Sequence, residues 1–140
     1  MKNTTRLNPY LTFKGNCREA MEHYKEVFDG ELEIMPFEGS PVEVPDSYKE
    51  EIMHSTLRVG DAIIMASDGQ PSQPIEIGNA HFMMVNTTEL GAAKRYFEKL
   101  SGGGQVIMPM EKTFWGSVFG MLTDKFGIGW MISVELSPSN

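Results

Sequence analysis

The sequence predicts an α+β fold of two tandem modules, each ordered strand, helix, strand, strand, strand. Two amphipathic helix patterns occur, and each is preceded by one strand pattern and followed by three. The two helices have expected N-caps at Asn16 and Thr87 and are followed by glycines at Gly30 and Gly102. The distance along the chain between the two N-caps agrees to within one residue with the distance between the two glycines. Repetition at a fixed spacing indicates a duplicated unit. We therefore expect one domain, residues 1–140, with module 1 at about 1–68 and module 2 at about 79–136.

Module 1 opens with LNPYLTF (7–13), which alternates loosely as a strand does. The next segment predicts a helix, with Asn16 as N-cap and Glu19 completing a capping box. Its apolar residues form one continuous stripe. Further strands are expected at ELEIMPF (31–37) and, as a hairpin around Gly60, at 52–59 and 61–67. The stripe consists of Cys17, Ala20, Met21, Tyr24, Val27 and Phe28.

Module 2 repeats this order after a connection rich in proline and glycine at residues 68–78. AHFMMVN (80–86) predicts a strand, and the segment from Thr87 to Gly102 predicts a helix. Three more strands are expected at 105–110, 116–124 and 129–135. Between the last two strands, TDKFGIG has glycines where a tight turn needs them.

Composition and charge exclude several classes of protein. The net charge is −7, with 12 basic and 19 acidic residues, whereas a nucleic-acid partner requires a basic surface. The chain has no apolar run of about 18 residues for a membrane span and no signal-peptide pattern. The single cysteine cannot form an internal disulfide. We expect a cytoplasmic protein without nucleic-acid or membrane partners.

No cofactor loop or catalytic thiol is expected. The run Gly102–Gly104 follows a helix and precedes a strand, whereas a phosphate-binding loop follows a strand and opens a helix. Gly127 and Gly129 lie in a turn between strands. Cys17 lies on an apolar helix stripe, which indicates a buried small hydrophobic residue.

One strand carries a polar strip. His54, Thr56 and Arg58 alternate along it and therefore share one face. This strip is either the solvent side of a sheet or the wall of a binding cavity, where His54 offers a hydrogen bond or a base and Arg58 an anion partner. The 11 methionines of the chain fill an irregular core or line an adaptable apolar cavity.

Four motifs connect the chain to a known family: PYLTFKGNCREA (9–20), HSTLRVG (54–60), EKTFW (111–115) and TDKFGIGWMISV (123–134). With the doubled module order, they resemble the PhnB-like branch of the vicinal oxygen chelate superfamily. That superfamily includes glyoxalases, bleomycin-resistance proteins and extradiol dioxygenases. The resemblance implies curved mixed sheets whose concave faces form a cup, and it implies a homodimer.

Enzymes of this superfamily hold a divalent metal ion through four ligands. The resemblance places these positions at Pro9, Met65, Ala80 and Met131, and none of these side chains binds a hard metal ion. We therefore expect neither a metal nor a cofactor. The alternative is a metal-dependent lyase or dioxygenase with ligands elsewhere, of which the first candidates are His54, Glu76 and His81.

If the cup is present, Met65 and Met131 replace ligand carboxylates in it and leave an apolar pocket that suits a planar or apolar ligand. We predict a metal-independent protein that binds a small molecule of unknown identity, without an assigned catalytic residue. The aromatic residues could instead fill the cup as core. A demethylubiquinone methyltransferase-like activity is the second alternative. The predicted cup lining is Tyr10, Thr12, His54, Arg58, Met65, Phe114, Trp115, Phe119, Trp130 and Met131.

Overall fold

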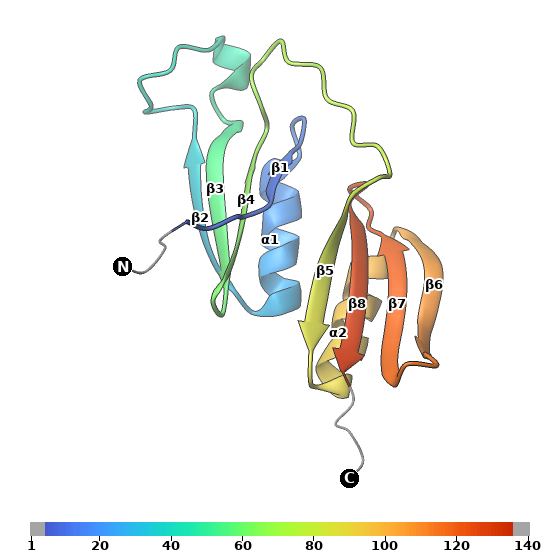
Figure 1. The fold of residues 1–140 in the computed structure, drawn as a ribbon. Helices are drawn as coiled ribbons and strands as arrows, with labels where there is room; N and C mark the ends of the chain where they lie inside the picture. Colours follow the sequence, from blue (N-terminus) through green and yellow to red (C-terminus); the bar gives the residue numbers. More distant parts are fainter. Residues whose placement is uncertain (1–4, 136–140) are drawn as a thin grey trace. The chain divides into compact units, whose positions relative to one another are not determined.

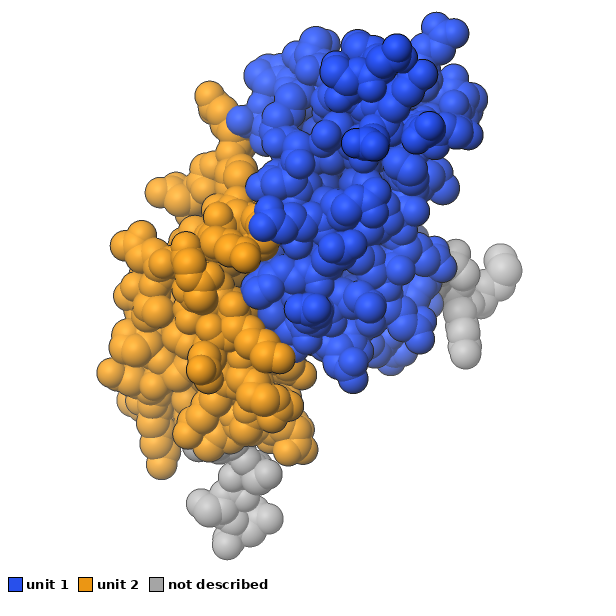
Figure 2. Space-filling view, turned by 180° about the vertical axis from the view of Figure 1, so that it is seen from behind, with its two compact units in different colours: residues 1–75 blue, residues 76–140 orange. Residues whose placement is uncertain are grey.

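A computed structural model describes residues 5–135 of the chain. The chain divides into two compact units, residues 1–75 and 76–140, which Figure 2 colours separately. Each unit contains one four-stranded sheet and one long α-helix, so the α+β fold of two repeated modules is confirmed. The single domain and the enclosed cup stay predictions. The prediction that the chain has no signal peptide concerns a segment that includes residues 1–4, which lie outside the described residues.

Unit 1 contains a mixed sheet in the order β1-β4-β3-β2 (Figure 1). Strand β1 runs parallel to β4, and the other neighbours are antiparallel. The connection between β2 and β3 includes one turn of 3-10 helix, η1. The elements are β1 (Tyr10–Thr12), α1 (Cys17–Phe28), β2 (Glu31–Pro36), η1 (Asp46–Tyr48), β3 (Ile52–Val59) and β4 (Ala62–Ser67).

Unit 2 repeats this topology with the sheet order β5-β8-β7-β6. Strand β5 is parallel to β8, and α2 lies behind the sheet in the view of Figure 1. Within residues 5–135, the helices are too short and too polar to cross a membrane. The elements are β5 (Phe82–Thr87), α2 (Leu90–Ser101), β6 (Gln105–Lys112), β7 (Ser117–Thr123) and β8 (Gly129–Glu135).

The predicted apolar stripe of α1 is fully buried. It packs on one face of the sheet, where the Cys17 Sγ lies 3.7 Å from the Ser55 Oγ on β3. Burial raises the pKa of the Cys17 thiol to about 12, although the hydrogen bond with Ser55 opposes the shift. Cys17 is therefore the buried small hydrophobic residue that the sequence predicted.

The start of α1 is capped differently from the prediction. Asn16 does occupy the N-cap position, but its side chain makes no capping hydrogen bond. Instead, the Asp68 Oδ1 at the end of β4 accepts hydrogen bonds from the Gly15 and Cys17 amides, at 2.9 and 3.0 Å. The Oδ2 of Asp68 accepts the Ile52 amide at 2.8 Å. This buried carboxylate therefore joins the loop before α1, the start of β3 and the end of β4. The predicted capping box was wrong.

Helix α2 begins two residues later than predicted. Its N-cap is Glu89, and the Thr87 Oγ1 instead accepts the Glu89 amide in a short turn before the helix. The helix packs closely on β7, because a Cβ on Gly120 would lie only 2.7 Å from the Phe97 ring. If the two modules are aligned by their helix starts, each residue before α1 therefore corresponds to a residue of module 2 that lies two positions later than predicted.

The TDKFGIG segment forms the β7–β8 turn, as the sequence predicted, and Gly127 has the positive φ, 91°, that such a turn favours. The buried Asp124 organises it: its Oδ1 accepts the Phe126 and Ile128 amides at 2.8 and 3.0 Å. Its Oδ2 accepts the Trp130 Nε1–H at 2.9 Å. Each unit is thus held together at one end by a buried aspartate.

Replacing Asp68 with alanine should strongly destabilise the protein. Three backbone N–H groups would lose their acceptor, and each buried unsatisfied group costs about 1–3 kcal/mol. We expect a loss of about 3 kcal/mol or more in the free energy of unfolding, measured by urea denaturation. The control is Asp46→Ala, which removes an exposed ion pair with Lys49 and should cost about 1 kcal/mol at most. Equal losses in the two variants would contradict the role of Asp68.

Glu51 should make stability depend on pH. Burial, followed by the charge of Asp68, raises the pKa of Glu51 above its usual value of 4.5. The folded state thus binds the proton more tightly, so this contribution is complete below pH 4.5 and is lost as pH rises through the folded pKa. Glu51→Gln should raise the free energy of unfolding at neutral pH and leave it unchanged in acid. Glu50→Gln, at an exposed position, is the control. Urea denaturation curves in which Glu51→Gln stabilises equally at both pH values would contradict this account.

Candidate functional site

The side of the unit 1 sheet that faces away from α1 carries the predicted polar residues; we call it the open face of unit 1. Because Ser55 and Leu57 of β3 are buried toward α1, the alternating His54, Thr56 and Arg58 point the other way. The strand register places Tyr10 and Thr56 on either side of Met65. Five predicted residues therefore share this face: Tyr10, Thr12, His54, Arg58 and Met65.

A short hydrogen-bonded chain crosses this face. The Tyr10 hydroxyl lies 3.2 Å from His54 Nδ1, and the Thr56 hydroxyl lies 3.2 Å from His54 Nε2. A neutral imidazole has one donor and one acceptor nitrogen, so one hydroxyl accepts a hydrogen bond from the ring and the other donates one to it. Both nitrogens of the ring therefore have a hydroxyl partner, one on β1 and one on β3. The sequence placed Thr56 on this strip but did not predict it as a binding residue.

Arg58 adds a positive charge to the same face. It is exposed and lies between Glu31 on β2 and Ile63 on β4, its cross-strand partners. A guanidinium group can bind a carboxylate or a phosphoryl group through two parallel hydrogen bonds. The open face of unit 1 therefore combines a hydroxyl–imidazole–hydroxyl chain with an anion-binding group.

Unit 2 also has a face turned away from its helix, the open face of unit 2. Phe119 on β7 and Met131 on β8 lie on it, paired respectively with Ser133 and Met121. Both side chains are half-buried. Two predicted cup residues are therefore together on this face.

Trp130 lies on the opposite face from Met131, because adjacent residues of a strand alternate. It is fully buried with Leu122 and Ile132 on the α2 side, and its indole donates to Asp124. The prediction that groups Trp130 and Met131 on one surface is corrected accordingly: Trp130 is a core residue of unit 2.

Phe114 and Trp115 lie in the β6–β7 turn and not on a sheet face. Their rings stack edge to face with centroids 4.8 Å apart, and they are 97% and 62% exposed. Hydrogen bonds between Thr113 and Ser117 close the turn beneath them. Their role as cup lining stays a prediction.

The strand register does not align the four positions implied by the resemblance, and the assignment of family ligand positions stays a prediction. Met65 pairs with Tyr10, so Pro9, one residue earlier, is out of register with it. Met131 pairs with Met84, whereas Ala80 precedes β5 in a bend.

The candidate ligands of the metal-dependent alternative, His54, Glu76 and His81, are not grouped into a metal site among the described residues. Glu76 and His81 are exposed and belong to unit 2, whereas His54 belongs to unit 1 and is bonded to two hydroxyls. Among residues 5–135, no three histidine, cysteine, aspartate or glutamate side chains are close enough to hold a metal ion.

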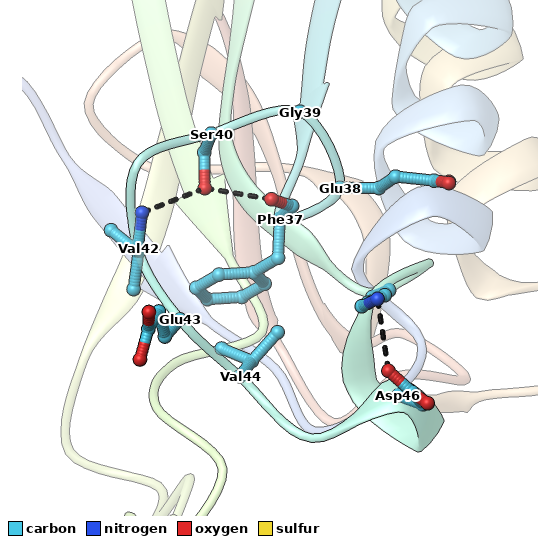
Figure 3. A pocket seen from close by; sticks show the side chains of 9 residues that line it. Phe37, Glu38, Gly39, Ser40, Val42, Glu43, Val44 and Asp46 are labelled. Carbon is cyan, nitrogen blue, oxygen red and sulfur yellow. Dashed lines mark hydrogen bonds and ion pairs between the residues drawn. The ribbon is translucent and has the colours of Figure 1, made fainter.

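A separate pocket of about 410 Å³ lies in the β2–β3 connection of unit 1 (Figure 3). The Ser40 hydroxyl stabilises the loop by donating to the Phe37 carbonyl at 2.7 Å and accepting the Val42 amide at 3.3 Å. Across the pocket, Lys49 forms an ion pair with Asp46 at 2.9 Å. None of the ten predicted cup residues lines this pocket.

Comparison with known proteins identifies the family. The family model described as 3-demethylubiquinone-9 3-methyltransferase matches residues 5–133. The protein YjdN of Escherichia coli is 33% identical over an aligned length of 143 residues, and the alignment covers 91% of this chain and 94% of YjdN.

Solved structures share the fold. Protein PA1353 from Pseudomonas aeruginosa is 42% identical, with a TM-score of 0.88 over 96% of this chain and all of that one. A PhnB protein from Bacillus cereus, described by the same methyltransferase name, is 24% identical, with a TM-score of 0.76 over 95% of this chain and all of that one.

A glyoxalase/bleomycin resistance protein/dioxygenase family enzyme from Burkholderia phytofirmans is more distant, at 14% identity and a TM-score of 0.57, and the match covers 89% of this chain and 95% of that enzyme. At that identity the likeness shows the fold alone. The repeated modules, the motifs and the family match lead to one conclusion: this chain belongs to the family whose model is described as 3-demethylubiquinone-9 3-methyltransferase, and it shares its fold with the PhnB protein and the glyoxalase/bleomycin resistance protein/dioxygenase family enzyme.

Proposed function

We propose that this protein binds a planar, anionic small molecule on the open face of unit 1 without a divalent metal ion. The observation that supports this most is the Tyr10–His54–Thr56 hydrogen-bonded chain, with Arg58 two residues further along β3. An aromatic carboxylate or phosphonate would stack over Tyr10 and His54 and present its charge to Arg58. Met65 would supply an adaptable apolar contact between the strands.

We further propose that the protein acts in the cytoplasm as a homodimer, without nucleic-acid partners. The net charge of −7 supports the last point, because nucleic acid would be repelled. The single buried cysteine is compatible with a reducing compartment. The homodimer follows from the resemblance to the superfamily.

A thermal-shift panel of aromatic carboxylates, phosphonates and antibiotic-like compounds tests the binding site. A ligand that binds only the folded protein raises its melting temperature. With the compound that gives the largest shift, Arg58→Ala should weaken binding by about 10- to 100-fold, because a hydrogen bond to a charged group contributes about 1.5–3 kcal/mol. Tyr10→Phe should weaken it by about fivefold, because a neutral hydrogen bond contributes about 1 kcal/mol.

The matched controls for this experiment are Arg18→Ala and Lys25→Ala, both at exposed positions on α1, which covers the other face of the unit 1 sheet. They should bind as the unaltered protein does. A panel without any stabilising compound, or losses of affinity in the controls as large as in Arg58→Ala, would refute the proposed site.

The main alternative is a metal-dependent lyase or dioxygenase. We expect elemental analysis of protein purified without chelators to give Zn, Ni, Mn and Fe well below one equivalent, because Met65 and Met131 are poor ligands for hard ions. Stoichiometric metal that is lost in His54→Ala or His81→Ala would favour the alternative instead.

Methyl transfer is the second alternative, because the family model carries that name. The glycine runs do not favour it: Gly102–Gly104 leads from α2 into β6, and Gly127 lies in the β7–β8 turn, so neither opens a helix. Calorimetric binding of S-adenosylmethionine would support this activity over the one proposed.

A further inference from the structure

Four methionines form a continuous row across the open face of unit 2. Met84 on β5 pairs with Met131 on β8, Met131 pairs with Met121 on β7, and Met121 pairs with Met108 on β6. The β6–β7 register shifts on both sides of Met108, so Met110, two residues further along β6, faces α2 instead. Directly paired residues of neighbouring strands point to the same face. The strand register therefore gives one thioether to each of the four strands at the same level; we call this set the methionine row.

Filling the core beneath α2 does not explain the row. That core is formed on the other face by Leu122, Trp130 and Ile132, all fully buried. The two outer members of the row are half-exposed, Met84 at 51% and Met108 at 47%. Methionine is not among the residues that strands favour, so leucine, valine or isoleucine would serve an apolar sheet face equally well. What methionine has and these residues lack is a thioether sulfur.

The spacing of the row suits coordination of one ion. Paired residues of neighbouring strands lie about 4.5–5.5 Å apart. Two sulfur atoms that share an ion, with metal–sulfur bonds of about 2.3 Å, lie roughly 3.8–4.6 Å apart. Methionine has three rotatable bonds, so the outer side chains can lean toward the centre. Met131 has Met84 on one side and Met121 on the other, which brings three thioethers within reach of a common point.

Thioethers are soft, neutral ligands, and they select soft ions such as Cu(I) over Mg²⁺, Ca²⁺ or Mn²⁺. A carboxylate on the same face adds negative charge, since Glu111 pairs with Phe119, two residues from Met121. We propose that the methionine row binds a soft monovalent metal ion of the Cu(I) type, held by Met121, Met131 and one or both outer methionines. The observations behind this site all come from unit 2, whereas those behind the proposed small-molecule site come from unit 1.

Silver nitrate in chloride-free buffer is the probe, because Ag(I) is a diamagnetic ion of the same softness and charge. Two-dimensional NMR of protein labelled with ¹³C at the methionine methyl groups reports each thioether separately, after assignment by single Met→Leu variants. We expect one equivalent of Ag(I) to shift the methyl signals of the row and to leave that of Met110 unchanged. Met110 is the matched control because it lies on β6, two residues from Met108, yet its sulfur packs toward Gly120 on the α2 side.

Competition with a chromogenic Cu(I) chelator under anaerobic conditions measures affinity. The Met121→Leu/Met131→Leu double variant keeps side-chain volume and so should fold, yet it should bind Cu(I) at least about tenfold more weakly. Met110→Leu should bind normally, because its sulfur packs toward Gly120 on the α2 side. A Cys17→Ala background, which removes the single thiol, should also retain binding.

The dependence on pH separates thioethers from other ligands. A thioether has no proton to lose, so the affinity should be the same in mildly acidic and neutral buffer, whereas a histidine site weakens in acid. The proposal is overturned if Ag(I) shifts none of the four methyl signals, if the double leucine variant binds Cu(I) as tightly as the unaltered protein, or if affinity falls in acid as imidazoles become protonated.

Discussion

Each four-stranded sheet of this protein is covered by the single helix of its own module, and one helix can cover only one face. Alternation along the strands then decides the chemistry of both faces. On β3, Ser55 and Leu57 face α1 and are buried, while His54, Thr56 and Arg58 face away. On β8, Trp130 and Ile132 face α2, while Met131 faces away. One face of each sheet is therefore core, and the other can carry function.

Buried aspartates fix the ends of the elements that carry these faces. Asp68 joins the loop before α1, the first residue of β3 and the end of β4 through three backbone hydrogen bonds. Tyr10 and His54 belong to strands on either side of this junction, so it helps to hold their hydrogen bond in register. Asp124 has the same role in the β7–β8 turn, where it also holds the indole of Trp130. A charged group is tolerated in such places because several donors satisfy it.

Local patterns predicted the elements well because they depend on neighbouring residues. Strands β3 and β8 have the expected bounds, and the apolar stripe of α1 is buried as predicted. Periodicity shows which residues share a face but not which face a helix covers. The alternation of adjacent residues already separates Trp130 from Met131, so grouping them on one surface was an error of interpretation. Likewise, Thr87 resembled an N-cap, yet the helix begins after Glu89. Asp68 and the methionine row depend on contacts and register between distant strands, which one sequence does not display.

The central claim is that the open face of unit 1 is the ligand-binding surface, in preference to the loop pocket between β2 and β3. The most direct test is amide chemical-shift mapping with a bound aromatic phosphonate or carboxylate. We expect the largest shifts at Tyr10, His54, Thr56 and Arg58, where the polar side chains converge. Shifts concentrated at residues 37–49, with little change on β1 and β3, would place the ligand in the pocket of Figure 3 and contradict the account.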